Sequence, residues 1–167
     1  MEDLKSNKNI NEQSIDSENS KNSENITLEE KLQNTREYWT KVIHELNEHM
    51  KDLGGLQNLL NRVYSKRQDC VEYLSNLRVV LGKLKLAHKS QYAKLYANYK
   101  LNGQLRFSSD SSLNTQIESD LYDINEKINF IATHTEAMIE TLKTIDNMIY
   151  GISQRIKIYE LTNNIKF

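Results

Sequence analysis

The feature that most constrains the fold is a heptad repeat through the middle of the chain. Apolar residues fill most positions spaced alternately four and three apart from Leu56 to Leu95, which is typical of a helix packed along one seam. The 167 residues include no proline and only five glycines, so little can interrupt such a helix. The pattern predicts one helix from Leu56 to about Leu101, roughly 70 Å long. Its seam positions are Leu56, Leu60, Val63, Arg67, Cys70, Leu74, Leu77, Leu81, Leu84, His88, Gln91 and Leu95.

A second long repeat follows a polar loop that begins at Asn102-Gly103. Apolar residues from Ile117 to Tyr159 keep the same spacing, which predicts a helix over about 115–161. Two helices of matched length joined by a loop pack against each other in antiparallel directions. The two repeats therefore predict a long helical hairpin.

A shorter helix is expected before the hairpin. Thr27 and Glu30 form a capping-box pattern, and a leucine or tryptophan recurs every seventh residue from Leu32 to Leu53. Gly54-Gly55 can end this helix, because glycine adopts the positive φ common just past a helix C-terminus. A helix over 28–53 is long enough to cover only half of the next one.

The sequence thus predicts an all-α fold, a long antiparallel helical hairpin of coiled-coil type with an additional shorter N-terminal helix. Residues 1–26 are rich in Asn, Ser and Glu and carry few aliphatic side chains, so a disordered polar tail is expected there. Residues 27–167 are expected to form a single helical domain.

Positive charge is concentrated in one window. Between Tyr73 and Ser109 there are seven Lys or Arg residues and no Asp or Glu, whereas the rest of the chain has 15 basic against 23 acidic residues. Cations attract phosphates and aromatic rings stack on unpaired bases, so the window predicts binding of single-stranded nucleic acid. The candidate site residues are Arg78, Lys83, Lys85, Lys89, Tyr92, Lys94, Tyr96, Tyr99, Lys100 and Arg106.

Six of these residues share one stripe beside the seam, basic at its start and aromatic at its end. Because the N-terminal helix is too short to reach the aromatic end, the stripe is expected to bind nucleic acid, to contact another protomer or to pack against the third helix. The sequence leaves these alternatives open. The stripe consists of these six residues, Arg78, Lys85, Lys89, Tyr92, Tyr96 and Tyr99, together with Gly82.

No catalytic or metal-binding pattern is predicted. His44 and His49 lie five residues apart, whereas a zinc-protease helix needs two histidines at i and i+4, and no cofactor motif is present. Cys70 is the only cysteine, no apolar stretch can span a membrane, and the first 25 residues lack a signal-peptide pattern. A non-enzymatic protein without metal or cofactor is expected, located in the cytoplasm, or in the host cytoplasm if the protein is viral.

The segment Gln91–Gly103 resembles the UvsY family of bacteriophage recombination mediators, in which a long basic helix ends in a Lys/Arg- and Tyr-rich turn closed by glycine. Leu121–Glu160, with the basic Arg155-Ile156-Lys157, is similar to the family's C-terminal helix, so that the resemblance covers about residues 77–160. It implies a homo-oligomer that binds single-stranded DNA in recombination, repair and replication. It also implies two protein partners, a RecA-like recombinase that is loaded onto the strand and a single-strand-binding protein.

A second interpretation belongs to another class. The chain could be a structural coiled-coil adaptor or virion-assembly protein whose basic window contacts acidic protein surfaces, including the acidic remainder of a neighbouring copy. Charge reversal at Lys85, Lys89 and Lys94 distinguishes the two, because a mediator would lose DNA binding and an adaptor would lose its assembly.

Overall fold

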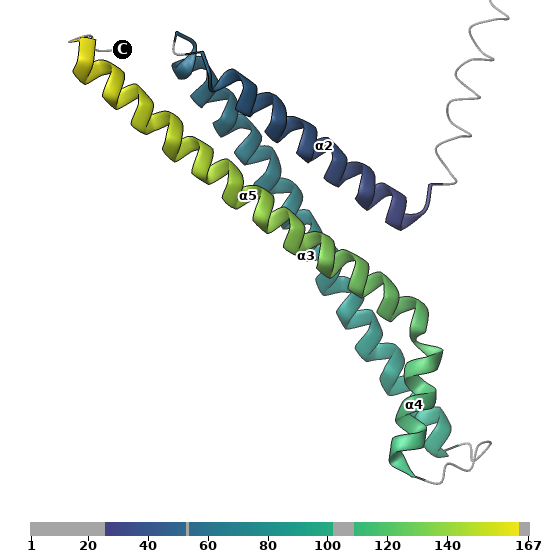
Figure 1. Ribbon diagram of the computed structural model, residues 1–167. Helices are drawn as coiled ribbons and strands as arrows, with labels where there is room; N and C mark the ends of the chain where they lie inside the picture. Colours follow the sequence, from purple (N-terminus) through teal and green to yellow (C-terminus); the bar gives the residue numbers. More distant parts are fainter. Residues whose placement is uncertain (1–25, 53, 102–108, 164–167) are drawn as a thin grey trace, which may run out of the picture.

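The computed structural model describes residues 26–52, 54–101 and 109–163, and nearly all of them are helical. The predicted tail over 1–26 therefore lies almost entirely outside the described residues. Four helices occur in the described part: α2 (Leu28–His49), α3 (Leu56–Leu101), α4 (Asp110–Asp120) and α5 (Tyr122–Asn163). α3 and α5 form a long antiparallel hairpin, α2 lies along one half of it, and α4 packs at the opposite end (Figure 1). The all-α hairpin with a shorter N-terminal helix is confirmed.

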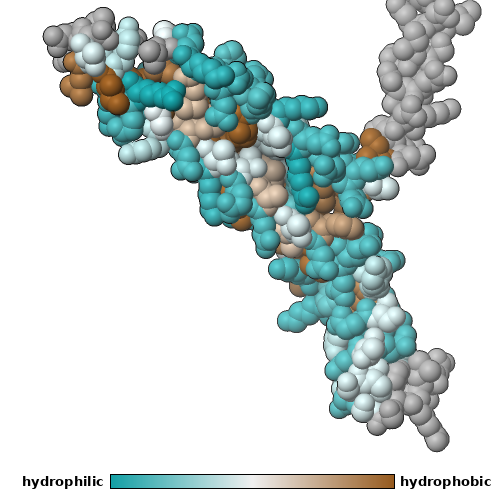
Figure 2. Space-filling model, in the orientation of Figure 1, coloured by the Kyte–Doolittle hydropathy of each residue, from teal (hydrophilic) through white to brown (hydrophobic). Residues whose placement is uncertain are grey.

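The main core lies where α2, α3 and α5 run together. Trp39 of α2, Val63 and Cys70 of α3, and Ile145 and Ile152 of α5 are all buried in one cluster. The predicted seam accounts for this core, because most of its positions between Leu56 and Leu77 are buried. The face shown in Figure 2 is mainly hydrophilic, with small separate hydrophobic patches.

Polar contacts fix the three helices to each other. Arg67 of α3 forms an ion pair with Asp146 of α5 (Nε–Oδ1 2.6 Å), and Arg155 of α5 donates to the Met50 carbonyl oxygen just past α2 (2.6 Å). α2 meets α3 through Glu45, which pairs with Arg62 (2.7 Å). These contacts lie in the half of the hairpin that α2 covers, as the length of the N-terminal helix predicts.

His134 joins all three helices from inside the core. Its Nδ1 accepts a hydrogen bond from Arg36 Nε of α2 (3.2 Å), and its Nε2 lies 2.8 Å from the Tyr73 hydroxyl of α3. Because a guanidinium can only donate, Nδ1 must be unprotonated and Nε2 carries the ring proton of a neutral imidazole. His134 is fully buried, and burial, with a smaller effect of Arg36, lowers its pKa to about 4.

Two helix boundaries differ from the sequence prediction. The first helix ends at His49 instead of Leu53, because the amides of Met50, Lys51 and Asp52 each bond to a carbonyl three residues back and tighten the last turn. The third helix was expected from Thr115 but starts at Asp110. It also breaks at Leu121, whose φ of −97° and ψ of 10° lie outside the helical region, which creates α4 as a separate helix.

Candidate nucleic-acid interface

Three basic residues and one tyrosine of α3 line up on one flank of the hairpin. Arg78, Lys85, Lys89 and Tyr96 fall within about 40° on a helical wheel and span about 27 Å along the axis. The same wheel places them on the side of Arg67, which reaches across to α5. Arg78, Lys85 and Lys89 are exposed, and none has a hydrogen bond or ion pair within the described part of the chain. These four residues are called the cationic row below.

Lys83 and Lys94 do not belong to the row. Both are exposed and have no polar partner among the described residues, but they lie about 120° or more around α3 from it. A strand that follows the row would therefore not reach them without wrapping around the helix. Arg106, the remaining predicted cation apart from Lys100, lies outside the described residues.

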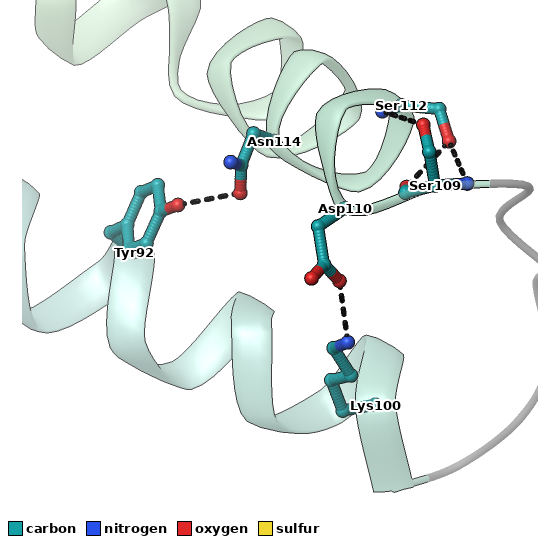
Figure 3. Close-up of polar contacts among 6 residues, drawn as sticks. All are labelled: Tyr92, Lys100, Ser109, Asp110, Ser112 and Asn114. Atoms are coloured by element: carbon teal, nitrogen blue, oxygen red, sulfur yellow. Dashed lines mark hydrogen bonds and ion pairs between the residues drawn. The ribbon is translucent and has the colours of Figure 1, made fainter.

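The aromatic end of the predicted stripe is largely used inside the chain. Tyr92 and Tyr99 pack, with Leu95, against a small second core formed by Leu113, Ile117 and Leu121 around α4. The Tyr92 hydroxyl donates to Asn114 Oδ1 (2.8 Å; Figure 3), and the Tyr99 hydroxyl donates to the Asp120 carboxylate. That second bond raises the pKa of Tyr99, because the carboxylate stabilises the protonated phenol. Of the alternatives, packing against the third helix holds for these two tyrosines.

Tyr96 is the member of the aromatic end that remains more accessible, with 37% of its surface exposed. Its ring stacks on that of Tyr92, with centroids 6.4 Å apart and 14° between the ring planes. Lys100 Nζ lies 5.6 Å from the Tyr96 ring centroid. Tyr96 is therefore the tyrosine that could stack on a base at the end of the row.

Lys100 is partly neutralised by α4. Its Nζ forms an ion pair with Asp110 Oδ1 at 2.6 Å (Figure 3), and the hydrogen bond to this carboxylate is the main cause that raises the pKa of Lys100. Among the lysines and arginines of α3 beyond Tyr73, within the described part, Lys100 is the one that has such a partner. The unpaired positive charge is thus concentrated toward the middle of α3.

α4 and the acidic and amide groups that it contributes were not predicted from the sequence. Ser109 and Ser112 form a reciprocal capping box at its start (Figure 3), a Ser-x-x-Ser variant of the usual Ser/Thr-x-x-Glu pattern. That serine pair is the signal that could have placed the helix start at Asp110 instead of Thr115. The contacts of Asp110, Asn114 and Asp120 with α3 have no such local signal.

The described residues hold no group of three or more His, Cys, Asp or Glu side chains that could bind a metal ion. Cys70 is fully buried, and burial raises the pKa of its thiol to about 11, so the thiol is not present as a reactive thiolate near neutral pH. In the same ranges, no helix is both long and apolar enough to cross a membrane.

No protein-family model matches this chain, and no curated protein or solved structure shows significant similarity to it. The resemblance to recombination mediators therefore stays a prediction.

Proposed function

We propose that this protein binds single-stranded DNA along α3 without catalysing a reaction, and that it acts as a recombination mediator. The observation that carries the proposal is the cationic row, in which Arg78, Lys85 and Lys89 are exposed and have no anionic partner in the described chain. Exposed cations without an anionic partner favour a polyanion as their ligand.

A single strand fits this flank better than a duplex. The row ends at Tyr96, whose ring is accessible and already stacked on Tyr92. A strand with unpaired bases can extend this stack, whereas the bases of a duplex already stack on each other. With three or four phosphates bound per protomer, the logarithm of affinity should fall with the logarithm of salt concentration with a slope of about −2 to −3.

The mediator role rests on the resemblance of residues 77–160 to the UvsY family. It implies that several copies assemble on the strand and help to load a RecA-like recombinase in place of a single-strand-binding protein. Assembly would also strengthen weak binding by each protomer, because a strand bound to one protomer is held at a high effective concentration near the sites of its neighbours.

The first test is charge reversal within the row. The K85E/K89E variant is expected to lose at least about tenfold in affinity for labelled oligo-dT, because two phosphate contacts are replaced by repulsion. Its salt slope should decrease in magnitude by about 1.4 per protomer. Fluorescence anisotropy at several salt concentrations measures both effects, and a duplex of the same sequence tests the preference for single strands.

The matched control is K31E/K41E, which makes the same change in net charge at two exposed lysines of α2 whose side chains have no polar partner among the described residues. Equal losses for both variants would mean that only net charge matters and would reject the row as a site. If K85E/K89E instead dissociates an oligomer and wild-type protein does not bind oligo-dT, the adaptor interpretation replaces the proposed function. Light scattering on both variants measures the assembly.

A further inference from the structure

A second strip of α3 carries exposed apolar side chains that this chain does not cover. Val79 and Leu86 are 53% and 70% exposed, and they lie at least about 120° around the helix from the buried Leu74 and Leu77 that face α5. Gly82 lies between them, three residues after Val79 and four before Leu86, and Ala93 lies one heptad beyond Leu86. These four residues are called the outer strip.

The N-terminal helix does not reach the outer strip. α2 touches α3 through Glu45, which pairs with Arg62, and through Tyr38, whose hydroxyl accepts from Lys66. Both contacts lie before Tyr73 and on another side of α3. Within the described chain, the strip therefore remains open to a partner.

Gly82 supports close approach by another helix. A Cβ added at this position would meet no atom within 4 Å, so no contact within the described chain requires glycine there. Glycine inside a helix costs about 1 kcal/mol relative to alanine. A missing side chain between Val79 and Leu86 instead leaves a shallow gap that a partner's side chain can fill.

Charge identifies the chemistry of the occupant. Lys83 and Lys94 border the strip on one side, Arg78 and Lys89 border it on the other, and all four lack partners in the described residues. Two copies that paired through identical strips would bring these cations together, which disfavours self-association here. Carboxylates on both sides of an apolar ridge would complement the strip.

We propose that the outer strip of α3 docks an acidic amphipathic helix of a partner protein. Leucines or similar residues of that helix would lie on Val79 and Leu86 and across Gly82, while its flanking carboxylates would pair with Lys83 and Lys94. Peptide docking can be tested without DNA, because Val79 and Leu86 lie about 60° to 120° around α3 from the cationic row; Arg78 and Lys89 border both surfaces.

The test uses a synthetic three-heptad peptide with leucine at the a and d positions and glutamate beside them. Wild-type protein is expected to bind it, and the V79S/L86S variant should bind it at least about tenfold more weakly, because both apolar contacts are lost. Isothermal titration calorimetry measures the affinities. Serine at two exposed positions should leave the fold intact, which circular dichroism verifies.

Two controls make the test specific. The Y150S/L161S variant removes two comparably exposed apolar side chains from α5, 68% and 81% exposed, and should bind the peptide as wild type does. A peptide of the same composition with its leucines spread around the helix should bind much more weakly. Equal binding of the two peptides, or unchanged binding by V79S/L86S, would overturn the proposal.

Competing occupants give different results. If V79S/L86S converts an oligomer of the wild-type protein into monomers, a second copy occupies the strip and the proposal is wrong. If the variant loses oligo-dT affinity as strongly as K85E/K89E does, nucleic acid occupies the strip and the proposal is again wrong. Absence of oligo-dT binding by wild-type protein would reject the proposed function alone, since peptide docking is measured without DNA.

Discussion

Replacing Trp39 with alanine is expected to lower the free energy of unfolding by about 3–5 kcal/mol and to release α2 from the hairpin. Trp39 is only 4% exposed and is the largest of the three buried side chains that α2 contributes, the others being Leu32 and Leu46. The three are spaced seven apart, so the middle contact is lost and each remaining leucine holds a short end. A helix that loses most of its buried face has little intrinsic stability in water.

Urea unfolding followed by circular dichroism measures the free energy, and limited proteolysis shows whether α2 becomes accessible while α3 and α5 stay protected. Y64A is the matched control, because Tyr64 is 49% exposed and has no polar or ring contact in the described chain. Its effect should stay within about 0.5 kcal/mol. Cleavage of α3 as readily as α2 in W39A would show that the hairpin does not hold without α2, contrary to this expectation.

The hairpin could be predicted because the spacing of apolar residues that specifies it is short-range and repeats along the chain. From Leu56 to Leu77 the seam positions recur so regularly, with no proline in the chain, that only helices packed along their length can bury them. The break at Leu121 could not be predicted in this way. No glycine or proline marks it, and the Leu121 amide still donates a hydrogen bond to the Ile117 carbonyl while its backbone leaves the helical region.

The candidate site was predicted in part. The cations of the row follow from helical periodicity, since residues seven apart share a side of a helix. Whether Tyr92 and Tyr99 are available to a ligand depends on their hydrogen bonds to Asn114 and Asp120. Those two residues follow a loop and lie in a helix whose start was predicted wrongly. A seam pattern gives the facing surfaces of a hairpin, but the polar pairs across it depend on register, which the spacing alone does not fix.

The contacts of His134 illustrate the same limit within the core. Its position beside the seam predicts a histidine at a helix interface. Its acceptor role toward Arg36, 98 residues away, depends on how α2 packs against α5, which no local pattern specifies. That role has a consequence for acid stability, because a protonated ring could no longer accept from the guanidinium and would place a positive charge beside it.

Stability is therefore expected to fall as the pH decreases from about 6.5 to about 4. In this window an unfolded histidine with the ordinary pKa of 6.5 binds a proton, whereas folded His134, with its pKa lowered to about 4, does not. The unfolded state then binds more protons, so the free energy of unfolding rises with pH, and a total on the order of 3 kcal/mol is lost between neutral pH and the folded pKa.

The H134Q variant should lose this pH dependence. A glutamine carbonyl can accept from Arg36 and its amide can donate to the Tyr73 oxygen, so both polar contacts can be kept without a titrating group. Urea unfolding at several pH values between about 7 and 4.5 gives the difference in stability between H134Q and wild type, in which the carboxylate titrations common to both proteins cancel. That difference should shift in favour of H134Q as the pH falls, whereas H44Q, at an exposed histidine, should follow the wild-type curve. Parallel curves for H134Q and wild type would mean that folded His134 takes up its proton at the same pH as the unfolded residue, and Arg36 would then have to leave Nδ1 as the ring is protonated.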